Sequence, residues 1–258
     1  MRIISLNANG IRAARRKGFF PWMLKQKADV VCIQETKAQV AQLDEEVLSP
    51  KNYHAYFNDA EKKGYSGVAL YARRQPDRIV TSLGWDHADR EGRFIQADFG
   101  KLSVISIYLP SGSSSEERQA IKFDFMDRLM PLLEKMRRQK RDYIICGDWN
   151  IAHKKIDIKN WRGNQNNSGF LPEERAWMDD LFDRVGLVDA FRVVDQRPEQ
   201  YTWWSNRGQA WAKNVGWRID YQVISPRLRD KVQRARIYTK QRFSDHAPLI
   251  MEYDAELP

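Results

Sequence analysis

The chain has 258 residues, 42% of them apolar and 30% charged, a balance that excludes a disordered polymer and fits one α/β domain spanning residues 1–258. Lysine and arginine number 43 against 34 acidic residues, so the formal charge of +9 favours a polyanionic partner such as nucleic acid, although composition alone fits a merely basic soluble protein equally well. Two isolated cysteines and no long apolar run argue against a zinc site and a membrane span, and they predict a cytoplasmic protein.

The predicted elements alternate between apolar strands and amphipathic helices, as in layered α/β folds. In chain order, the strand-like segments are 2–10, 29–37, 102–112, 143–150, 217–225 and 244–253. Segments 116–139 and 171–186 carry apolar residues at helical spacing. Pro131 is expected to kink or interrupt the first of these helices, and Pro172 is expected to begin the second.

Polar side chains gather where the predicted strands end. The strand-end residues are Asn7, Asn9, Gln34, Glu35, Tyr108, Asp148 and Asn150, while Asp220 lies inside a strand and Asp245 and His246 precede one. Side chains two apart in an extended chain share a face, so Asn7 with Asn9 and Asp148 with Asn150 are each expected to project into one cleft. Any one of these residues alone is more often a turn former or helix cap, but their coincidence predicts a shared site.

Asp220 is the residue that a turn explains least. A carboxylate between Ile219 and Tyr221 needs a charged or hydrogen-bonding partner, because burying it alone costs much free energy. His246 is the expected partner. Asp245 is a poorer partner for His246, since adjacent residues in extended chain point to opposite sides.

The residue types indicate the chemistry. Carboxylates and amides with one histidine and no cysteine are hard oxygen donors that suit Mg²⁺, or Mn²⁺ in its place. A divalent cation, a carboxylate that orients water and a histidine that stabilises a negative oxygen together suit the hydrolysis of a phosphoester. The end of the segment "YIICGDWN" is therefore a candidate for presenting a base and an amide to a phosphate.

Short motifs spread over nearly the whole chain resemble one known family. They are "NANGIR", "QETK", "GYSGVALY", "DREGRF", "YLPSG", "GDWNIAH", "GFLPEERAWM", "LVDAFR", "YTWW", "VGWRIDY" and "SDHAP". In this order they resemble the exonuclease III class of apurinic/apyrimidinic endonucleases, within the endonuclease/exonuclease/phosphatase superfamily. The resemblance implies a four-layer α/β sandwich, with two mixed β-sheets packed face to face and flanked by helices. We expect a monomer.

The resemblance also implies a role for each residue of the site. Asp148 resembles the residue that orients or deprotonates the attacking water, Asn150 the one that helps to hold that water and the phosphate, and Tyr108 a phosphate contact. His246, paired with Asp220, resembles the phosphate-binding histidine. The metal positions are Glu35, Asn7, Asp245, Asp148 and Asn150. Whether one ion works or two is left open.

Two segments are expected to hold the DNA. The first, 152–171, is long, basic and amide-rich without periodicity, and it is either functional or a solvated loop. The second, 201–220, is rich in tryptophan, which alone is more often core. The resemblance assigns DNA contacts to Arg12, Arg16, Tyr65, Arg93, Asn160, Asn164, Asn167 and Arg207. It assigns a pocket for a base-less sugar to Trp203, Trp217 and Ile219.

The resemblance has departures as well as matches. Asn9 stands where some members carry an aspartate, and Ser111 is too short to insert into a duplex, whereas Arg207 can wedge into DNA. The implied substrate is double-stranded DNA with abasic sites or blocked 3′ ends. The implied reaction is Mg²⁺-dependent incision 5′ to an abasic site that leaves a 3′ hydroxyl and a 5′ deoxyribose phosphate, with 3′ to 5′ exonuclease and 3′-end cleaning as further activities.

Two other functions stay open. One is a non-catalytic regulator of the same fold that binds nucleic acid or protein, which would be free to lose the site residues. The other is a phosphoesterase acting on lipids or inositol phosphates, which the basic charge disfavours.

Overall fold

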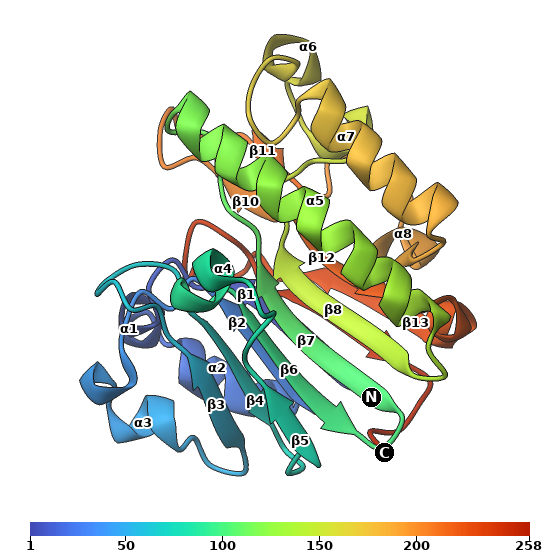
Figure 1. Cartoon of the computed structure of the whole chain (residues 1–258). Helices are drawn as coiled ribbons and strands as arrows, with labels where there is room; N and C mark the ends of the chain where they lie inside the picture. Colours follow the sequence, from blue (N-terminus) through green and yellow to red (C-terminus); the bar gives the residue numbers. More distant parts are fainter.

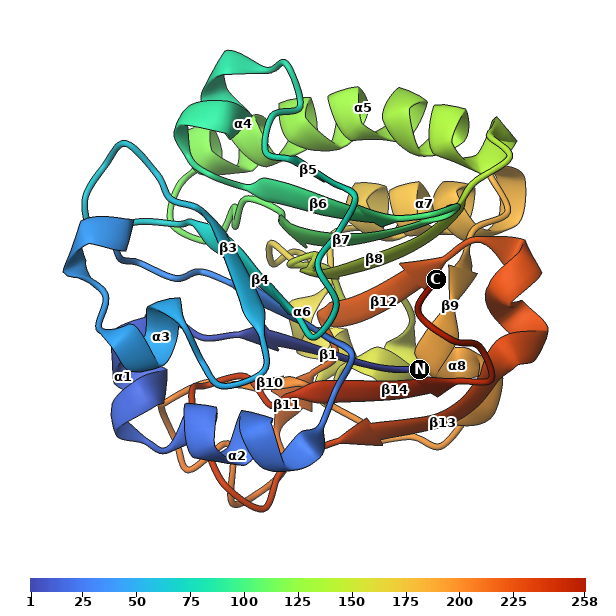
Figure 2. The same ribbon diagram turned by 90° about the horizontal axis from the view of Figure 1, so that it is seen from below.

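The computed structural model describes residues 1–258 and arranges them in four layers (Figures 1 and 2). Between α2 (Phe19–Gln26) at the bottom of Figure 2 and α5 (Glu116–Arg138) at its top lie two β-sheets, one above the other. The expected four-layer sandwich of two mixed sheets is confirmed. The chain ends meet at one edge, where the Met1 ammonium donates to the Tyr253 carbonyl at 2.8 Å. None of the helices has the length and apolar composition that a membrane span requires.

Each sheet has six strands. The first runs in the order β13 (Val232–Ile237), β14 (Leu249–Tyr253), β1 (Arg2–Asn7), β2 (Val30–Gln34), β4 (Val68–Ala72) and β3 (His54–Asn58). The second runs in the order β5 (Arg78–Val80), β6 (Phe94–Phe99), β7 (Leu102–Tyr108), β8 (Asp142–Asp148), β12 (Asp220–Ile224) and β9 (Val188–Asp189). A separate ribbon pairs β10 (Trp203–Trp204) with β11 (Gly216–Trp217). Only β1 with β2 and β7 with β8 are parallel neighbours.

The remaining helices and turns are short. The other helices are α1 (Ile11–Arg16), α3 (Glu45–Leu48), α4 (Asp86–Arg90), α6 (Trp161–Asn164), α7 (Pro172–Asp179) and α8 (Ala190–Val194). Turns of 3₁₀ type span Val40–Gln42, Lys155–Asp157 and Pro226–Lys231, and a π-helical turn spans Asp180–Arg184.

Apolar clusters hold the layers together. One cluster fills the space between the sheets, one lies under α5 and α7, and one lies under α1 and α2. Cys32 and Cys146 are buried free thiols in the central cluster, as predicted.

The two predicted helices form, with one correction. Helix α5 runs unbroken through Pro131, so the prediction of an interruption is wrong. Pro131 lies on the exposed side of the helix, where water can satisfy the carbonyl that loses its amide partner. Helix α7 begins at Pro172, as predicted, and the π-helical turn follows it before Gly186 reverses the chain with φ of +76°.

A buried charge network ties segment 152–171 to β12. Asp157, which is 1% exposed, accepts from Arg218 Nε at 2.8 Å and from Arg192 Nη2 at 2.6 Å. Arg218 also donates to Asp189 at 2.6 Å. Burial would raise the pKa of Asp157, but the charge and hydrogen bond of Arg218, followed by those of Arg192, lower it to about 2. This network fixes the strand that carries Asp220.

Asp157 therefore makes stability depend on acid pH. A carboxyl whose pKa is lower in the folded state stabilises the fold fully above its unfolded pKa of about 4, and this contribution is lost as pH falls toward about 2. We expect the folding advantage of wild type over Asp157→Asn to shrink by about 2 kcal/mol across that window, because each pKa unit is worth about 1.4 kcal/mol. Urea unfolding of both proteins between pH 7 and pH 2.5 measures it, and a pH-independent difference would contradict the assignment.

Candidate active site

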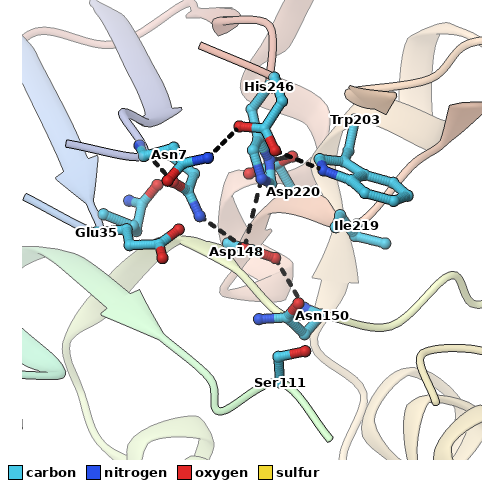
Figure 3. A network of polar contacts seen from close by, with 12 residues as sticks. Asn7, Glu35, Ser111, Asp148, Asn150, Trp203, Ile219, Asp220 and His246 are labelled. Carbon is cyan, nitrogen blue, oxygen red and sulfur yellow. Dashed lines mark hydrogen bonds and ion pairs between the residues drawn. The ribbon is translucent and has the colours of Figure 1, made fainter. Parts of the chain in front are cut away.

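Strand register brings the predicted residues to one edge of the sandwich. The parallel pairs align the last residues of β1 and β2, Asn7 with Gln34, and the last residues of β7 and β8, Tyr108 with Asp148. The antiparallel strand β12 starts opposite β8, so Asp220 pairs with Asp148. Strand β14 runs antiparallel to β1, so the turn before β14 reaches the same edge. Figure 3 shows the resulting convergence of side chains from both sheets.

A cavity of about 760 Å³ opens at this edge. It is lined by Asn9, Glu35, Tyr108, Ser111, Asp148, Asn150, Asn167, Trp203, Trp217, Ile219, Asp245 and His246, among others. Asn7 and Asp220 lie behind it, each 1% exposed. Of the eleven predicted catalytic, metal and sugar-pocket residues, the other nine all line this one cavity.

Asp148 is held from two sides. Its Oδ2 accepts from Asn7 Nδ2 at 2.8 Å, and its Oδ1 accepts from the Asn150 backbone N–H at 2.9 Å. The side-chain Nδ2 of Asn150 in turn donates to the Leu109 carbonyl at 2.8 Å. The carboxylate is 2% exposed, so its orientation is fixed by these contacts.

His246 has the partner that the sequence predicted. Its Nδ1 lies 2.8 Å from Asp220 Oδ2, and its Nε2 lies 3.9 Å from Asp148 Oδ2 (Figure 3). Two residues that the sequence reasoning missed set this geometry. Ser244 Oγ donates to the Asn7 carbonyl at 2.7 Å and accepts from the His246 N–H at 2.8 Å. Thr202 Oγ1 accepts from the Asp220 N–H at 3.1 Å.

These contacts shift the charges of the two central groups. Burial, and then the charge of Asp220, raises the pKa of Asp148 to about 7, although His246 and the hydrogen bonds from Asn150 and Asn7 oppose the shift. Burial alone would lower the pKa of His246, but Asp220, and then Asp148, raise it to about 10. His246 is therefore a cation at neutral pH beside a carboxyl group that is ready to exchange a proton.

Tyr108 completes this side of the cavity as a neutral phenol. Burial raises its pKa well above the ordinary value, and the charge of Glu35 adds to the effect, while Arg93 opposes it. The hydroxyl therefore keeps its proton at neutral pH and remains a hydrogen-bond donor.

A chain of contacts links the acidic groups on the other side. Glu35 Oε1 lies 2.9 Å from Lys37 Nζ, which donates to Asn9 Oδ1 at 2.6 Å. Asn9 Nδ2 donates to Asp245 Oδ1 at 2.9 Å, and Trp203 Nε1 donates to Asp245 Oδ2 at 3.0 Å. Lys37 was missed, because a lysine beside a glutamate ordinarily indicates a solvated surface pair.

The backbone is strained where these residues lie. Asn9, Glu35, Lys37 and Asn150 have φ of +42°, +55°, +48° and +54°. The prediction that Asn7 with Asn9, and Asp148 with Asn150, share a face through extended-strand alternation is wrong. The backbone instead turns at each pair, so that the N–H of the second residue donates to the side-chain oxygen two residues earlier. Non-glycine residues in this conformation are costly and cluster at functional sites.

The donor set fits a hard divalent cation. Glu35 uses only one carboxylate oxygen in a protein contact, and Asp245 and Asp148 add further oxygens around the same cavity. The tightest group of possible ligands is instead Asp148, Asp220 and His246, within 4.8 Å of one another. Because His246 Nδ1 is already bonded to Asp220 Oδ2, this group is better described as a charge network than as the ion site.

The aromatic end of the cavity comes from the small ribbon. Trp203 pairs with Trp217 across β10 and β11, and their rings meet edge to face at 6.0 Å. Both rings are half-buried, whereas Ile219 is 6% exposed beneath them. Gly169, at φ of +93°, lies against the other side: a Cβ there would come within 3.0 Å of the Trp217 ring.

The predicted DNA contacts are distributed around the rim, and one of them is buried. Arg12, Arg16, Asn160, Asn167 and Arg207 are exposed, and Asn164 and Tyr65 are half-buried. Asn167 lines the cavity, while Asn160 and Asn164 lie outside it and bond to each other, Asn164 Nδ2 donating to the Asn160 carbonyl at 2.7 Å.

Arg93 is the exception, because it is only 1% exposed. It donates to Glu91 at 2.6 Å, to the Tyr108 carbonyl at 2.9 Å and to the Tyr65 hydroxyl at 3.1 Å. Its direct contact with DNA stays a prediction. The guanidinium positions Tyr108 and Tyr65, a role that a sequence motif cannot separate from surface binding.

The comparison with known proteins agrees with this geometry. A family model described as the Endonuclease/Exonuclease/phosphatase family matches residues 4–246. The chain belongs to this family. It is 39% identical to an exodeoxyribonuclease from Bacillus subtilis over 251 residues, which is 96% of this chain and 98% of that protein.

One further relative is named a DNA repair nuclease, and one similar solved structure is that of an AP endonuclease. The DNA repair nuclease APEX1 of Danio rerio is 35% identical over 260 residues, covering 97% of this chain and 81% of that protein. The structure of an AP endonuclease from Archaeoglobus fulgidus superposes with a TM-score of 0.90 at 28% identity, over 99% of this chain and all of that one.

The aromatic wall makes a testable distinction between a sugar pocket and a core. Trp217→Ala should weaken discrimination between abasic and intact duplex, while its stability loss stays below the roughly 3 to 5 kcal/mol of a fully buried tryptophan. Trp204→Ala, at a 3% exposed neighbour that does not line the cavity, is the matched control and should lose stability but keep discrimination. Thermal unfolding and incision of both duplexes measure this, and full discrimination by folded Trp217→Ala would refute the pocket.

Proposed function

We propose that this enzyme, a DNA repair nuclease of the exonuclease III and AP endonuclease type, incises double-stranded DNA on the 5′ side of an abasic site. The products would be a 3′ hydroxyl and a 5′ deoxyribose phosphate. One observation carries the proposal: a proton-accepting carboxylate, Asp148, and a cationic imidazole, His246, face one cavity whose far wall is aromatic.

The charged side of the cavity suits a phosphodiester. The Nε2–H of cationic His246 would donate to a non-bridging phosphate oxygen and stabilise the charge that develops there. Asp148, whose carboxylate is oriented by its contacts with Asn7 and Asn150, would take the proton of the attacking water. The neutral hydroxyl of Tyr108 would donate to the phosphate or to the leaving oxygen.

A divalent cation belongs to this proposal. Glu35, Asp245 and Asn7, with Asp148 and Asn150, would hold Mg²⁺, or Mn²⁺ in its place, and the ion would neutralise phosphate charge during hydrolysis. Asn9 bonds to Asp245 through its Nδ2, so an amide here supports the ligands even where other members carry an aspartate.

The aromatic side suits a nucleotide that lacks its base. A flipped sugar would lie in the part of the cavity lined by Trp203, Trp217 and Ile219. An unstacked abasic site costs less free energy to extrude than a paired nucleotide. Exposed Arg12, Arg16 and Arg207 would contact phosphates, which position a duplex without reading its sequence. Selectivity would then come from shape.

The same hydrolysis at a strand end would give 3′ to 5′ exonuclease and 3′-end cleaning activity. The Bacillus subtilis relative is named an exodeoxyribonuclease, which supports this extension. A non-catalytic regulator on this fold is disfavoured, because Glu35, Asp148, Asn150, Asp245 and His246 all line one cavity.

A duplex with one tetrahydrofuran abasic analogue tests the proposal. Wild type with Mg²⁺ should cut once, 5′ to the analogue, and leave a 3′ end that a polymerase extends; EDTA should abolish cutting. Asp148→Asn should slow the reaction by about 10²- to 10⁴-fold, the usual worth of a general base, while still binding the duplex. Gel analysis of end-labelled strands reports both results. An analogue strand that wild type leaves intact would refute the proposed function. Normal turnover by Asp148→Asn would refute the role of Asp148 as the base.

A further inference from the structure

A fully buried ion pair lies behind the cavity, between the two helices that cover the second sheet. Lys122 of α5 and Glu174 of α7 are both 0% exposed, and Lys122 Nζ lies 2.5 Å from Glu174 Oε1. Apolar residues of similar volume would often stabilise such a position as well or better, because two desolvated charges lose much hydration energy. Stability alone therefore does not account for this pair.

Both charged groups also bond to the backbone of loops. Lys122 Nζ donates to the Asn150 carbonyl at 2.8 Å. Glu174 Oε2 accepts from the Gly169 N–H at 2.6 Å and from the Leu171 N–H at 3.0 Å. The pair thus bonds at once to the turn that follows Asp148 and to the end of segment 152–171.

These two backbone segments also touch each other at a point of close packing. The ideal Cβ position of Gly169 lies 3.1 Å from the Asn150 carbonyl and 3.0 Å from the Trp217 ring. Gly169 therefore lies wedged between the turn of the proton acceptor and the aromatic wall. A shift of segment 169–171 would move its contact with both.

A third loop meets the same pair through Gln119. Its Nε2 donates to Glu174 Oε1 at 3.1 Å, and its side chain lies against Gly112, where an added Cβ would be 2.7 Å from the Ser168 hydroxyl. Gly112 belongs to the segment that follows Tyr108, which also lines the cavity. Three cavity loops therefore contact this ion pair or its partner Gln119.

We propose that Lys122 and Glu174 are positioning residues, which hold the Asn150 turn and segment 169–171 in one fixed relation. Neither touches the cavity. Through Asn150 the pair orients the hydrolytic group, and through Gly169 it sets the aromatic wall against that group. This inference rests on the proposed function, since it assigns the two sides of the cavity to a phosphate and to a base-less sugar.

Two double variants separate the two tethers without leaving an unpaired buried charge. Lys122→Met with Glu174→Gln removes the bond to Asn150 but keeps an acceptor for Gly169 and Leu171. Lys122→Met with Glu174→Leu removes both tethers. Leu129→Ala, a 1% exposed site on α5 remote from the loops, is the matched control for lost stability.

The first double variant should lower kcat by about tenfold to a hundredfold, the effect of small misplacements at a reacting centre, with KM and abasic preference unchanged. The second should lose abasic preference as well. Leu129→Ala should melt earlier and keep both wild-type values. Wild-type kcat and preference in the folded double variants would overturn the inference. Should the doubles fail to fold, Lys122→Met alone decides, because it removes the bond to Asn150 while Glu174 keeps its backbone donors. Wild-type kcat in this variant would count equally against the tether.

Amide hydrogen exchange keeps the inference separate from the proposed function. The Gly169 and Leu171 amides should exchange faster in the second double variant than in the first or in Leu129→Ala. If wild type fails to cut abasic DNA, the proposed function fails while this exchange pattern still tests the tether. Unchanged exchange at both amides in the second double variant would overturn the inference.

Discussion

A protonated imidazole held between two buried carboxylates is the interaction on which the rest of the site depends. His246 lies 2.8 Å from Asp220 and 3.9 Å from Asp148, and all three side chains are at most 5% exposed. Each charge alone would be expensive to bury. The two carboxylates repel each other, so both depend on the cation between them, and the cation depends on them. The pairing explains how a carboxylate tolerates a place inside β12, and it leaves a cation facing the cavity at neutral pH.

The fold satisfies this requirement through strand direction. Parallel pairs at the centre of each sheet end at the same edge, and the antiparallel neighbours β12 and β14 begin there. Charged groups from both sheets therefore meet without a long connection. The turns after the strands then take strained φ values to aim polar groups into the cavity, and helices α5 and α7 hold those turns from behind through Lys122 and Glu174.

Local pattern predicted the strand ends, the burial of both cysteines and the pairing of Asp220 with His246, since each follows from neighbours in the chain. It did not predict the burial of Arg93 or the pair of Lys122 with Glu174. Helical spacing alone does not distinguish a lysine with a distant buried partner from one in solvent. Pro131 was misjudged because local propensity does not include the packing that holds α5 together. Cytoplasmic location and a monomeric state stay predictions.

An NMR pH titration of the His246 imidazole in the metal-free protein tests the central claim most directly. The chain has four histidines, so a His246→Gln variant assigns the signal. The pKa of His246 should lie near 10, because Asp220 and Asp148 favour the cation, and the ring should stay protonated across neutral pH. Titration near the ordinary histidine value of about 6.5 would show that the buried carboxylates do not hold a cation there, and would contradict the account.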